Sequence, residues 1–117
     1  EVMDSGNNDS VESVSICTHT LHILPITHSI SHKIMVSIKS TDIIVSKSVP
    51  TSISARNIIP SVIRNYYIQN ERVLLECDIG VNILAEITLY SFEELFLEKG
   101  MKIFLIIKSG NVIVVDP

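Results

Sequence analysis

The segment from residue 72 to residue 89 constrains the fold most, because its side chains follow a two-residue period. Its apolar members share one side of an extended chain and its acidic members share the other: Val73, Leu75, Cys77 and Ile79 against Glu76 and Asp78. Gly80 and Asn82 then mark a turn, and residues 83–89 form a second apolar run. A two-residue period is typical of strands and not of helices. The segment therefore predicts a β-hairpin.

The composition extends this prediction to the whole chain. The chain has 117 residues, of which 46% are hydrophobic, a size and content that suit one domain, or one domain with an extra subdomain. Isoleucine, valine and serine are abundant, whereas glycine and proline number only four each. Because β-branched residues favour strands, we expect a mainly all-β fold.

The same patterns predict the remaining elements. From the N-terminus, we expect a polar tail over 1–10, a hairpin of 11–18 with 20–24, strands over 34–39 and 42–46, and a seam between subdomains over 47–52. A long strand over 58–68, with Pro60 near its start, precedes the hairpin described above. Two further strands, 101–108 and 112–115, flank a turn over 109–111. The last strand is expected to close the second sheet. Ser91 and Glu94 form a capping box, and Gly100 sits where a C-terminal cap belongs, so one short helix is predicted near 91–98.

These elements predict small OB-like β-barrels. We divide the chain into a tail over 1–10, an N-terminal β subdomain over 11–50 and a second domain over 51–117. Met3 follows Glu1 and Val2, so we expect the chain to be part of a longer polypeptide.

Charge and hydropathy exclude several classes of function. Nine basic residues stand against thirteen acidic ones, the net charge is −4, and no basic run occurs, so a nucleic-acid partner is not expected. No apolar run approaches the roughly eighteen residues of a membrane span, and no signal-peptide pattern opens the chain. We therefore expect no direct membrane insertion.

Enzyme chemistry is not expected either. No GxxxxGK[ST] motif occurs, so this chain has no P-loop for ATP. Cys17 and Cys77 lack a nearby base, and two buried thiols are favoured over a disulfide. Four histidines have no CxxC or carboxylate partners for a metal site: His19, His22, His28 and His32. Tyr66 and Tyr67 suit a core or an interface better than a stacking platform, because no basic groove accompanies them. We predict no catalytic residue, metal or cofactor.

Three short segments at predicted strand ends carry donors for a small anion. They are Ser54-Ala55-Arg56-Asn57, Thr88-Leu89-Tyr90-Ser91 and Lys108-Ser109. Each supplies hydroxyls, backbone amides or a cation, and none pairs a nucleophile with a base. Taken singly, the residues also fit a helix cap, a strand residue and solvated cations. Together they suit a compact oxyanion.

The sequences and spacing of these segments resemble those of the molybdate-binding Mop/TOBE domain. The similarity runs over residues 51–117 and rests on SARNIIP from Ser54, ILAEITLYS ending at Ser91, Gly100, and IIKS ending at Ser109. Residues 34–48 resemble the preceding part of the regulatory domain at the C-terminus of molybdate-importer ATP-binding subunits. The whole chain is therefore similar to that regulatory domain.

The resemblance implies a dimer that binds molybdate or tungstate at the contact between two chains. Ser54, Ala55 and Arg56 of one chain would meet four residues of the other: Thr88, Ser91, Lys108 and Ser109. It also implies an upstream nucleotide-binding domain, a membrane permease, and a cytoplasmic position at the inner face of the membrane, where the oxyanion controls an ABC importer. The alternatives are a stand-alone molybdate store, the effector domain of a transcription regulator, and a dimerisation domain without ligand.

Two positions depart from the family pattern. Glu86 stands where the family often carries arginine, and Ser61 stands where glycine is frequent after the proline. From its place in the strand we expect the Glu86 side chain to point away from Thr88 and not to touch the ligand. A carboxylate that faced the site would repel a dianion.

Overall fold

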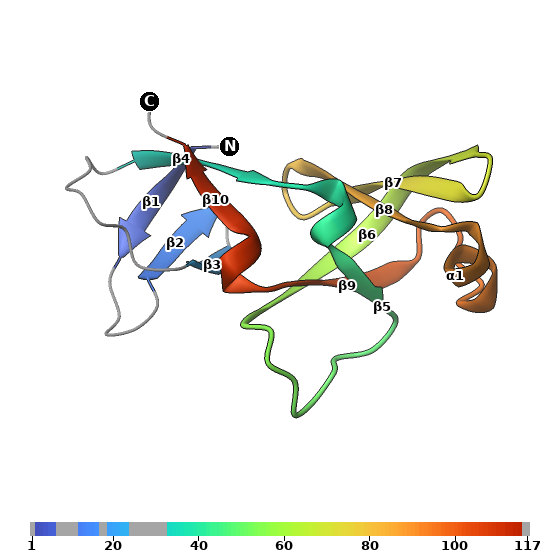
Figure 1. The fold of residues 1–117 in the computed structure, drawn as a ribbon, viewed down its shortest axis with the longest axis horizontal. Helices are drawn as coiled ribbons and strands as arrows, with labels where there is room; N and C mark the ends of the chain where they lie inside the picture. The colour runs from blue at the N-terminus through green and yellow to red at the C-terminus, as the bar shows by residue number, and fades with distance from the viewer. Residues whose placement is uncertain (1, 7–11, 17–18, 24–32, 116–117) are drawn as a thin grey trace.

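Two antiparallel five-stranded sheets make up the part of the chain that the structure describes. In this computed structural model the backbone is described for residues 2–6, 12–16, 19–23 and 33–115, and the side chains for residues 36–114. The two sheets lie next to each other along the long axis of the molecule (Figure 1). The fold is mainly β with one short α-helix, which confirms the predicted OB-like class. Among the described residues no helix has the length and apolar content that crossing a membrane requires.

The first sheet has the strand order β10-β4-β1-β2-β3. Its members are β10 (Val112–Val115), β4 (Lys33–Ile38), β1 (Val2–Gly6), β2 (Glu12–Ile16) and β3 (His19–Ile23). The pairing of β2 with β3 confirms the predicted hairpin. The predicted polar tail is wrong for residues 2–6, because β1 pairs with β2 on one side and β4 on the other. Pairing on both sides satisfies a strand's backbone groups even where its side chains are polar.

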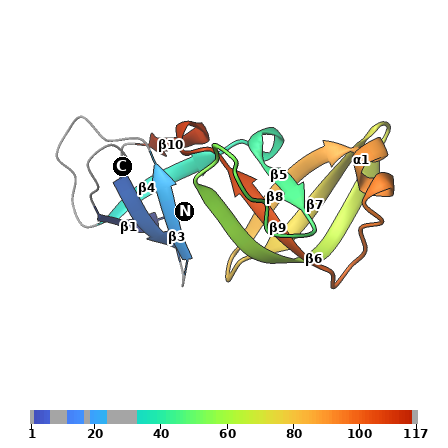
Figure 2. The same ribbon diagram turned by 90° about the horizontal axis from the view of Figure 1, so that it is seen from below.

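The second sheet has the strand order β5-β9-β6-β7-β8 and curls strongly (Figure 2). Its members are β5 (Ile44–Ser46), β9 (Lys102–Ile107), β6 (Asn57–Gln69), β7 (Arg72–Asp78) and β8 (Asn82–Thr88). The hairpin of β7 and β8 is confirmed. Val73, Leu75 and Cys77 are fully buried, as the two-residue period predicts. They form the main core together with residues of β6 and β9 such as Ile63 and Leu105.

The two sheets exchange their edge strands. β5 lies in the first half of the sequence but pairs with β9 of the second sheet, and β10 lies in the second half but pairs with β4 of the first. The prediction that residues 112–115 close the second sheet is therefore wrong, as the chain crosses over after the short 3₁₀ turn η2 (Ser109–Asn111). A short strand of four apolar residues fits either sheet, so the sequence of residues 112–115 does not encode which neighbour the strand pairs with.

The helix α1 (Leu89–Glu94) begins earlier than the sequence predicts. Its N-cap is Thr88, whose hydroxyl accepts a hydrogen bond from the Ser91 amide at 3.1 Å. Ser91 is therefore the third helical residue and not the cap. The β8 strand pairs up to Thr88, opposite Arg72, and this register fixes the start of the helix. The helix ends before Phe96, which has a φ of 53°.

Gly100 was expected to cap the C-terminus of the helix, and this prediction is wrong. It lies in the turn before β9 with a φ of 82°, a conformation that favours glycine. Its amide donates to the Ile63 carbonyl at 2.7 Å and thereby joins this turn to β6.

The exchange predicts that a fragment of residues 53–115 is less stable than one of residues 40–115. Only the longer fragment keeps β5 on the edge of β9, together with the buried side chain of Ile43. Thermal unfolding followed by circular dichroism should give the longer fragment the higher and sharper transition. Equal transitions in the two fragments would show that β5 adds nothing to the second sheet.

Candidate functional site

Part of the predicted site forms one hollow at the junction of β6 and β9. Ser54, Ala55 and Lys108 line a cavity of about 370 Å³ whose other walls are largely apolar: Ile44, Val45, Ser46, Pro50, Ile53 and Ile106. The strand register explains this meeting, because Asn57 at the start of β6 pairs with Ile107 at the end of β9. Residues just before Asn57 and just after Ile107 must therefore lie close together.

The Asn57 side chain holds this junction in place. It is 1% exposed, and its Nδ2 donates to the Ile107 carbonyl at 3.1 Å. A buried amide that bonds the neighbouring strand fixes the two strand ends from which Arg56 and Lys108 extend. The motif contains Asn57, but its partner lies fifty residues away, so the sequence does not reveal this role.

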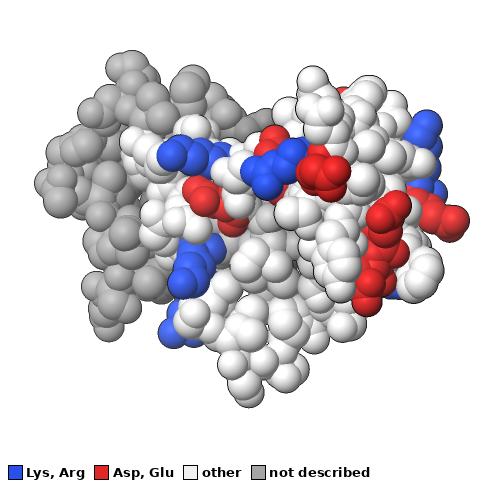
Figure 3. Space-filling model, turned by 45° about the vertical axis from the view of Figure 1, so that its right-hand side comes forward, with Lys and Arg blue, Asp and Glu red and all other residues white. Residues whose placement is uncertain are grey.

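Arg56 and Lys108 are both exposed cations beside the hollow. Within residues 36–114, the ion pairs join Arg64 to Asp78 and Arg72 to Glu86, and neither Arg56 nor Lys108 takes part in one. On the face drawn in Figure 3, basic and acidic side chains are interspersed, and no continuous basic stripe runs across it. Any attraction of an anion therefore depends on local groups such as these two cations.

Ser109 supplies the observation that points most directly to a ligand. Ser109 is 7% exposed, and its Oγ has no hydrogen-bond partner among the described residues. Leaving a buried hydroxyl without a partner costs about 1–3 kcal/mol, so such groups are rare in folded proteins. Ser109 follows directly after Lys108, which lines the hollow.

Thr88 and Ser91 lie together but away from this hollow. Thr88 Oγ1 donates to Ser91 Oγ at 3.0 Å, so their hydroxyls face one point, as predicted. Arg72 of β7, however, pairs with Thr88 of β8 on one side and with Gln69 of β6 on the other. Thr88 therefore lies near the C-terminal end of β6, whereas the hollow lies near its N-terminal end. The 13 residues of β6 extend roughly 40 Å along the strand at about 3.3 Å each. Figure 1 shows the start of α1 apart from the segment between β9 and β10. Within one chain the predicted donors therefore belong to two separate places, one on each of these segments.

The prediction that Glu86 points away from Thr88 is wrong. The two residues are two positions apart in β8 and so share one face of the strand. Glu86 Oε2 pairs with Arg72 Nε at 2.9 Å, and Arg72 is the cross-strand neighbour of Thr88. The ion pair with Arg72 offsets the negative charge of the Glu86 carboxylate, so Glu86 would repel a dianion near Thr88 less than an unpaired carboxylate would.

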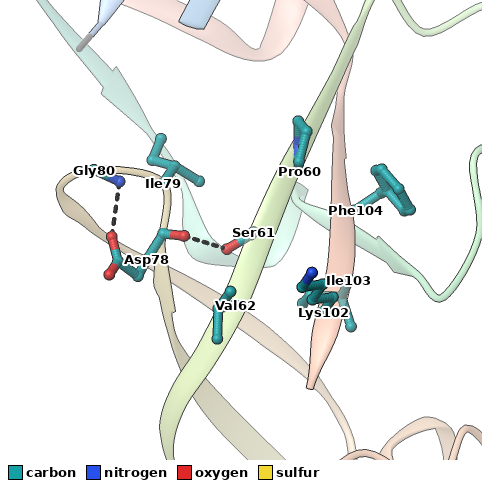
Figure 4. Close-up of a pocket in the computed structure, with 9 residues that line it drawn as sticks. All are labelled: Pro60, Ser61, Val62, Asp78, Ile79, Gly80, Lys102, Ile103 and Phe104. Atoms are coloured by element: carbon teal, nitrogen blue, oxygen red, sulfur yellow. Dashed lines mark hydrogen bonds between the residues drawn. The ribbon is translucent and has the colours of Figure 1, made fainter. Parts of the chain in front are cut away.

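A second hollow, of about 450 Å³, lies between β6, β9 and the turn after β7 (Figure 4). Ser61 is buried, and its Oγ donates to the Asp78 carbonyl at 3.1 Å. The Gly80 amide donates to the Asp78 carboxylate at 2.7 Å. The pKa of Asp78 lies below its usual range, mainly because of this hydrogen bond and to a smaller extent because of the one from Arg64. These polar groups stabilise the turn, and Ser61 gains a structural role in place of the more frequent glycine.

The remaining candidates for chemistry do not form a site in the described part of the chain. Cys77 is a free, buried thiol, as predicted, and burial raises its pKa to about 11. Cys17, His28 and His32 lie outside the described residues, as do the side chains of His19 and His22. Between residues 36 and 114 no three metal-ligating side chains gather.

Comparison with known proteins identifies a family and relatives for this chain. The TOBE domain family profile matches residues 53–114. The chain belongs to the TOBE-domain family. It is 36% identical over 86 residues to the molybdenum import ATP-binding protein ModC of Haemophilus ducreyi. That match covers 73% of this chain and 24% of ModC, so the chain spans about a quarter of this relative.

The fold also has a solved relative. A structure of the cytoplasmic molybdate-binding protein ModG with molybdate bound superposes with a TM-score of 0.81. The match covers 100% of this chain and 96% of ModG. The identity is 16%, so this likeness concerns the TOBE-like fold alone.

The N-cap at Thr88 predicts a measurable contribution to stability. Replacing an N-cap hydroxyl with alanine costs about 1 kcal/mol, so Thr88→Ala should lower the free energy of unfolding in urea by that amount. Thr88→Ser should retain most of the stability, and Thr51→Ala, in an exposed loop, should have no effect. Unchanged stability in Thr88→Ala would assign the Thr88–Ser91 pair a role other than capping.

Proposed function

We propose that this TOBE domain binds molybdate or tungstate at the contact between two copies of the chain. The observation that carries the proposal is the Ser109 hydroxyl, which is buried without a hydrogen-bond partner among the described residues. It follows Lys108, which lines a hollow together with Ser54 and Ala55. Two relatives support the choice of ligand, because ModC is a molybdenum import protein and ModG binds molybdate.

The donor set suits a tetrahedral dianion. The hollow has no carboxylate in its lining, and the two nearby cations are not engaged in ion pairs with the described residues. A micromolar site needs about 8 kcal/mol, and charge-assisted hydrogen bonds contribute about 1.5–3 kcal/mol each. Four to six donors reach this range after the costs of association.

A second copy of the chain completes the proposed site. Ser54, Arg56, Lys108 and Ser109 lie at one junction, whereas Thr88 and Ser91 lie at the far end of β6, so one chain does not unite them around one small ion. Around the hollow, Ile44, Val49 and Ile53 are 58%, 57% and 40% exposed. Apolar surface of this kind is what a dimer contact buries. An oxyanion that binds only the paired arrangement stabilises the dimer by its differential affinity.

The biological setting that we infer is control of an importer. In this setting the chain is the regulatory part of the ATP-binding subunit of an ABC-type molybdate importer. It acts at the cytoplasmic face of the membrane with an upstream nucleotide-binding domain and the permease. The similarity to ModC supports this setting. A free-standing molybdate store is the second candidate, because ModG matches over nearly the full length of both chains.

Isothermal titration of the full chain tests the choice of ligand. We expect heat from molybdate and tungstate at micromolar concentrations and none from sulfate at the same concentrations, together with a shift toward the dimer in analytical ultracentrifugation. A folded dimer that binds none of the three would support the alternative of a dimerisation domain without ligand.

Variants at the hollow test the assignment of residues. Lys108→Ala and Arg56→Ala should each lower molybdate affinity at least tenfold, which corresponds to about 1.4 kcal/mol. Ser109→Ala should also weaken binding, yet leave the free energy of unfolding unchanged or raised, because the lost hydroxyl has no partner among the described residues. Lys99→Ala removes an exposed lysine that does not line the hollow and serves as the control. Wild-type affinity in all three hollow variants would place the site elsewhere.

A further inference from the structure

Thr88 and Ser91, the predicted donors that lie away from the hollow, have beside them a cation that the sequence motifs do not include. Arg72 at the start of β7 is the direct cross-strand partner of Thr88 at the end of β8. Side chains directly opposite each other in an antiparallel pair stand on the same face of the sheet, with their Cβ atoms about 5 Å apart. The Arg72 side chain is therefore long enough to reach an ion bound at the Thr88 and Ser91 hydroxyls.

The guanidinium of Arg72 is only partly engaged. Its Nε donates to Glu86 Oε2 at 2.9 Å, and its two terminal nitrogens have no hydrogen-bond partner among residues 36–114. The Arg72 and Glu86 side chains are 55% and 29% exposed, so small ions have access to the pair. A guanidinium carries five N–H donors in a planar fork that fits an oxyanion. Nη1 and Nη2 thus remain available for a ligand while Nε stays bonded to Glu86.

The neighbouring hydroxyls also leave one donor for a ligand. Thr88 Oγ1 accepts from the Ser91 amide and donates to Ser91 Oγ. Ser91 Oγ accepts that bond, so its own proton is left for another acceptor, and no acceptor among residues 36–114 takes it. An oxyanion, which only accepts hydrogen bonds, fits both this O–H and the free edge of the Arg72 guanidinium.

We infer that Arg72 is a further oxyanion-binding residue, and that Glu86 sets the strength of binding by competing for its guanidinium. This inference rests on the proposed function, because it adds Arg72 to the half of the site that Thr88 and Ser91 supply. In the proposed dimer, Arg72 of one copy is the third cation of the site, after the two that the other copy contributes. A bound dianion draws the guanidinium toward itself, whereas the Glu86 carboxylate repels the dianion and holds the guanidinium back.

Isothermal titration of the full chain with sodium molybdate tests this inference. Arg72→Ala should weaken binding at least tenfold, because it removes charge-assisted hydrogen bonds and leaves Glu86 unpaired. Glu86→Gln should tighten binding about tenfold, because it removes a repelling charge and frees the guanidinium. Arg64→Ala removes the same charge from the ion pair at the opposite end of β7 and is the matched control.

The double variant Arg72→Ala with Glu86→Gln separates contact from charge. It removes one charge of each sign, so the net charge beside Thr88 stays as in the wild-type chain. If Arg72 contacts the oxyanion, the double variant binds molybdate at least tenfold more weakly than the wild-type chain. Arg72→Lys, which keeps the charge but lacks the planar fork, should also bind more weakly. Wild-type affinity in either variant would show that Arg72 only offsets the charge of Glu86, and would overturn the inference.

The outcomes also separate this inference from the proposed function. Binding that Lys108→Ala abolishes, but that Arg72→Ala and Glu86→Gln both leave unchanged, would overturn the role of Arg72 and keep the proposed site. The absence of binding in both the wild-type chain and Glu86→Gln would overturn both. An exposed ion pair contributes little to stability, so every variant should remain folded, which thermal unfolding followed by circular dichroism checks.

Discussion

The pairing of β6 with β9 is the contact on which the rest of the structure depends. It brings the segment before Asn57 next to the segment after Ile107, and the buried Asn57 amide fixes that contact through the Ile107 carbonyl. The hollow, the cations Arg56 and Lys108, and the residue Ser109 all belong to the segments that this pairing joins. A small oxyanion binds well only where donors are held in place beforehand, and a strand pair with a buried clamp provides such rigidity.

Much of the fold could be predicted because the relevant signals are local. The burial of Val73, Leu75 and Cys77 follows directly from the two-residue period of their strand. The helix was predicted in the right region, but its start was wrong, because both Thr88 and Ser91 are good N-cap residues. Only the register of β8 against Arg72, a long-range property, decides between them.

The residue types of the candidate site could be predicted from the sequence, but their arrangement could not. The motifs identify Ser54, Arg56, Lys108 and Ser109 because each segment carries donors at a strand end. Nothing local indicates that the Ser109 hydroxyl is buried with no hydrogen-bond partner among residues 36–114, or that Thr88 lies at the opposite end of β6. Aligning the chain with itself also shows that Ile38-Lys39-Ser40 repeats as Ile107-Lys108-Ser109 at a spacing of 69 residues.

The exchange of edge strands has a kinetic consequence. Ile38 pairs with Val112, which lies 74 residues later, and Ile44 pairs with Ile106, which lies 62 residues later. Contacts between such distant positions form slowly, because the loop must close before they contribute any energy. During synthesis neither sheet is complete until the second half of the chain has emerged, because β9 of the second sheet and β10 of the first both lie there. The two sheets therefore reach their native state together, as one late cooperative step.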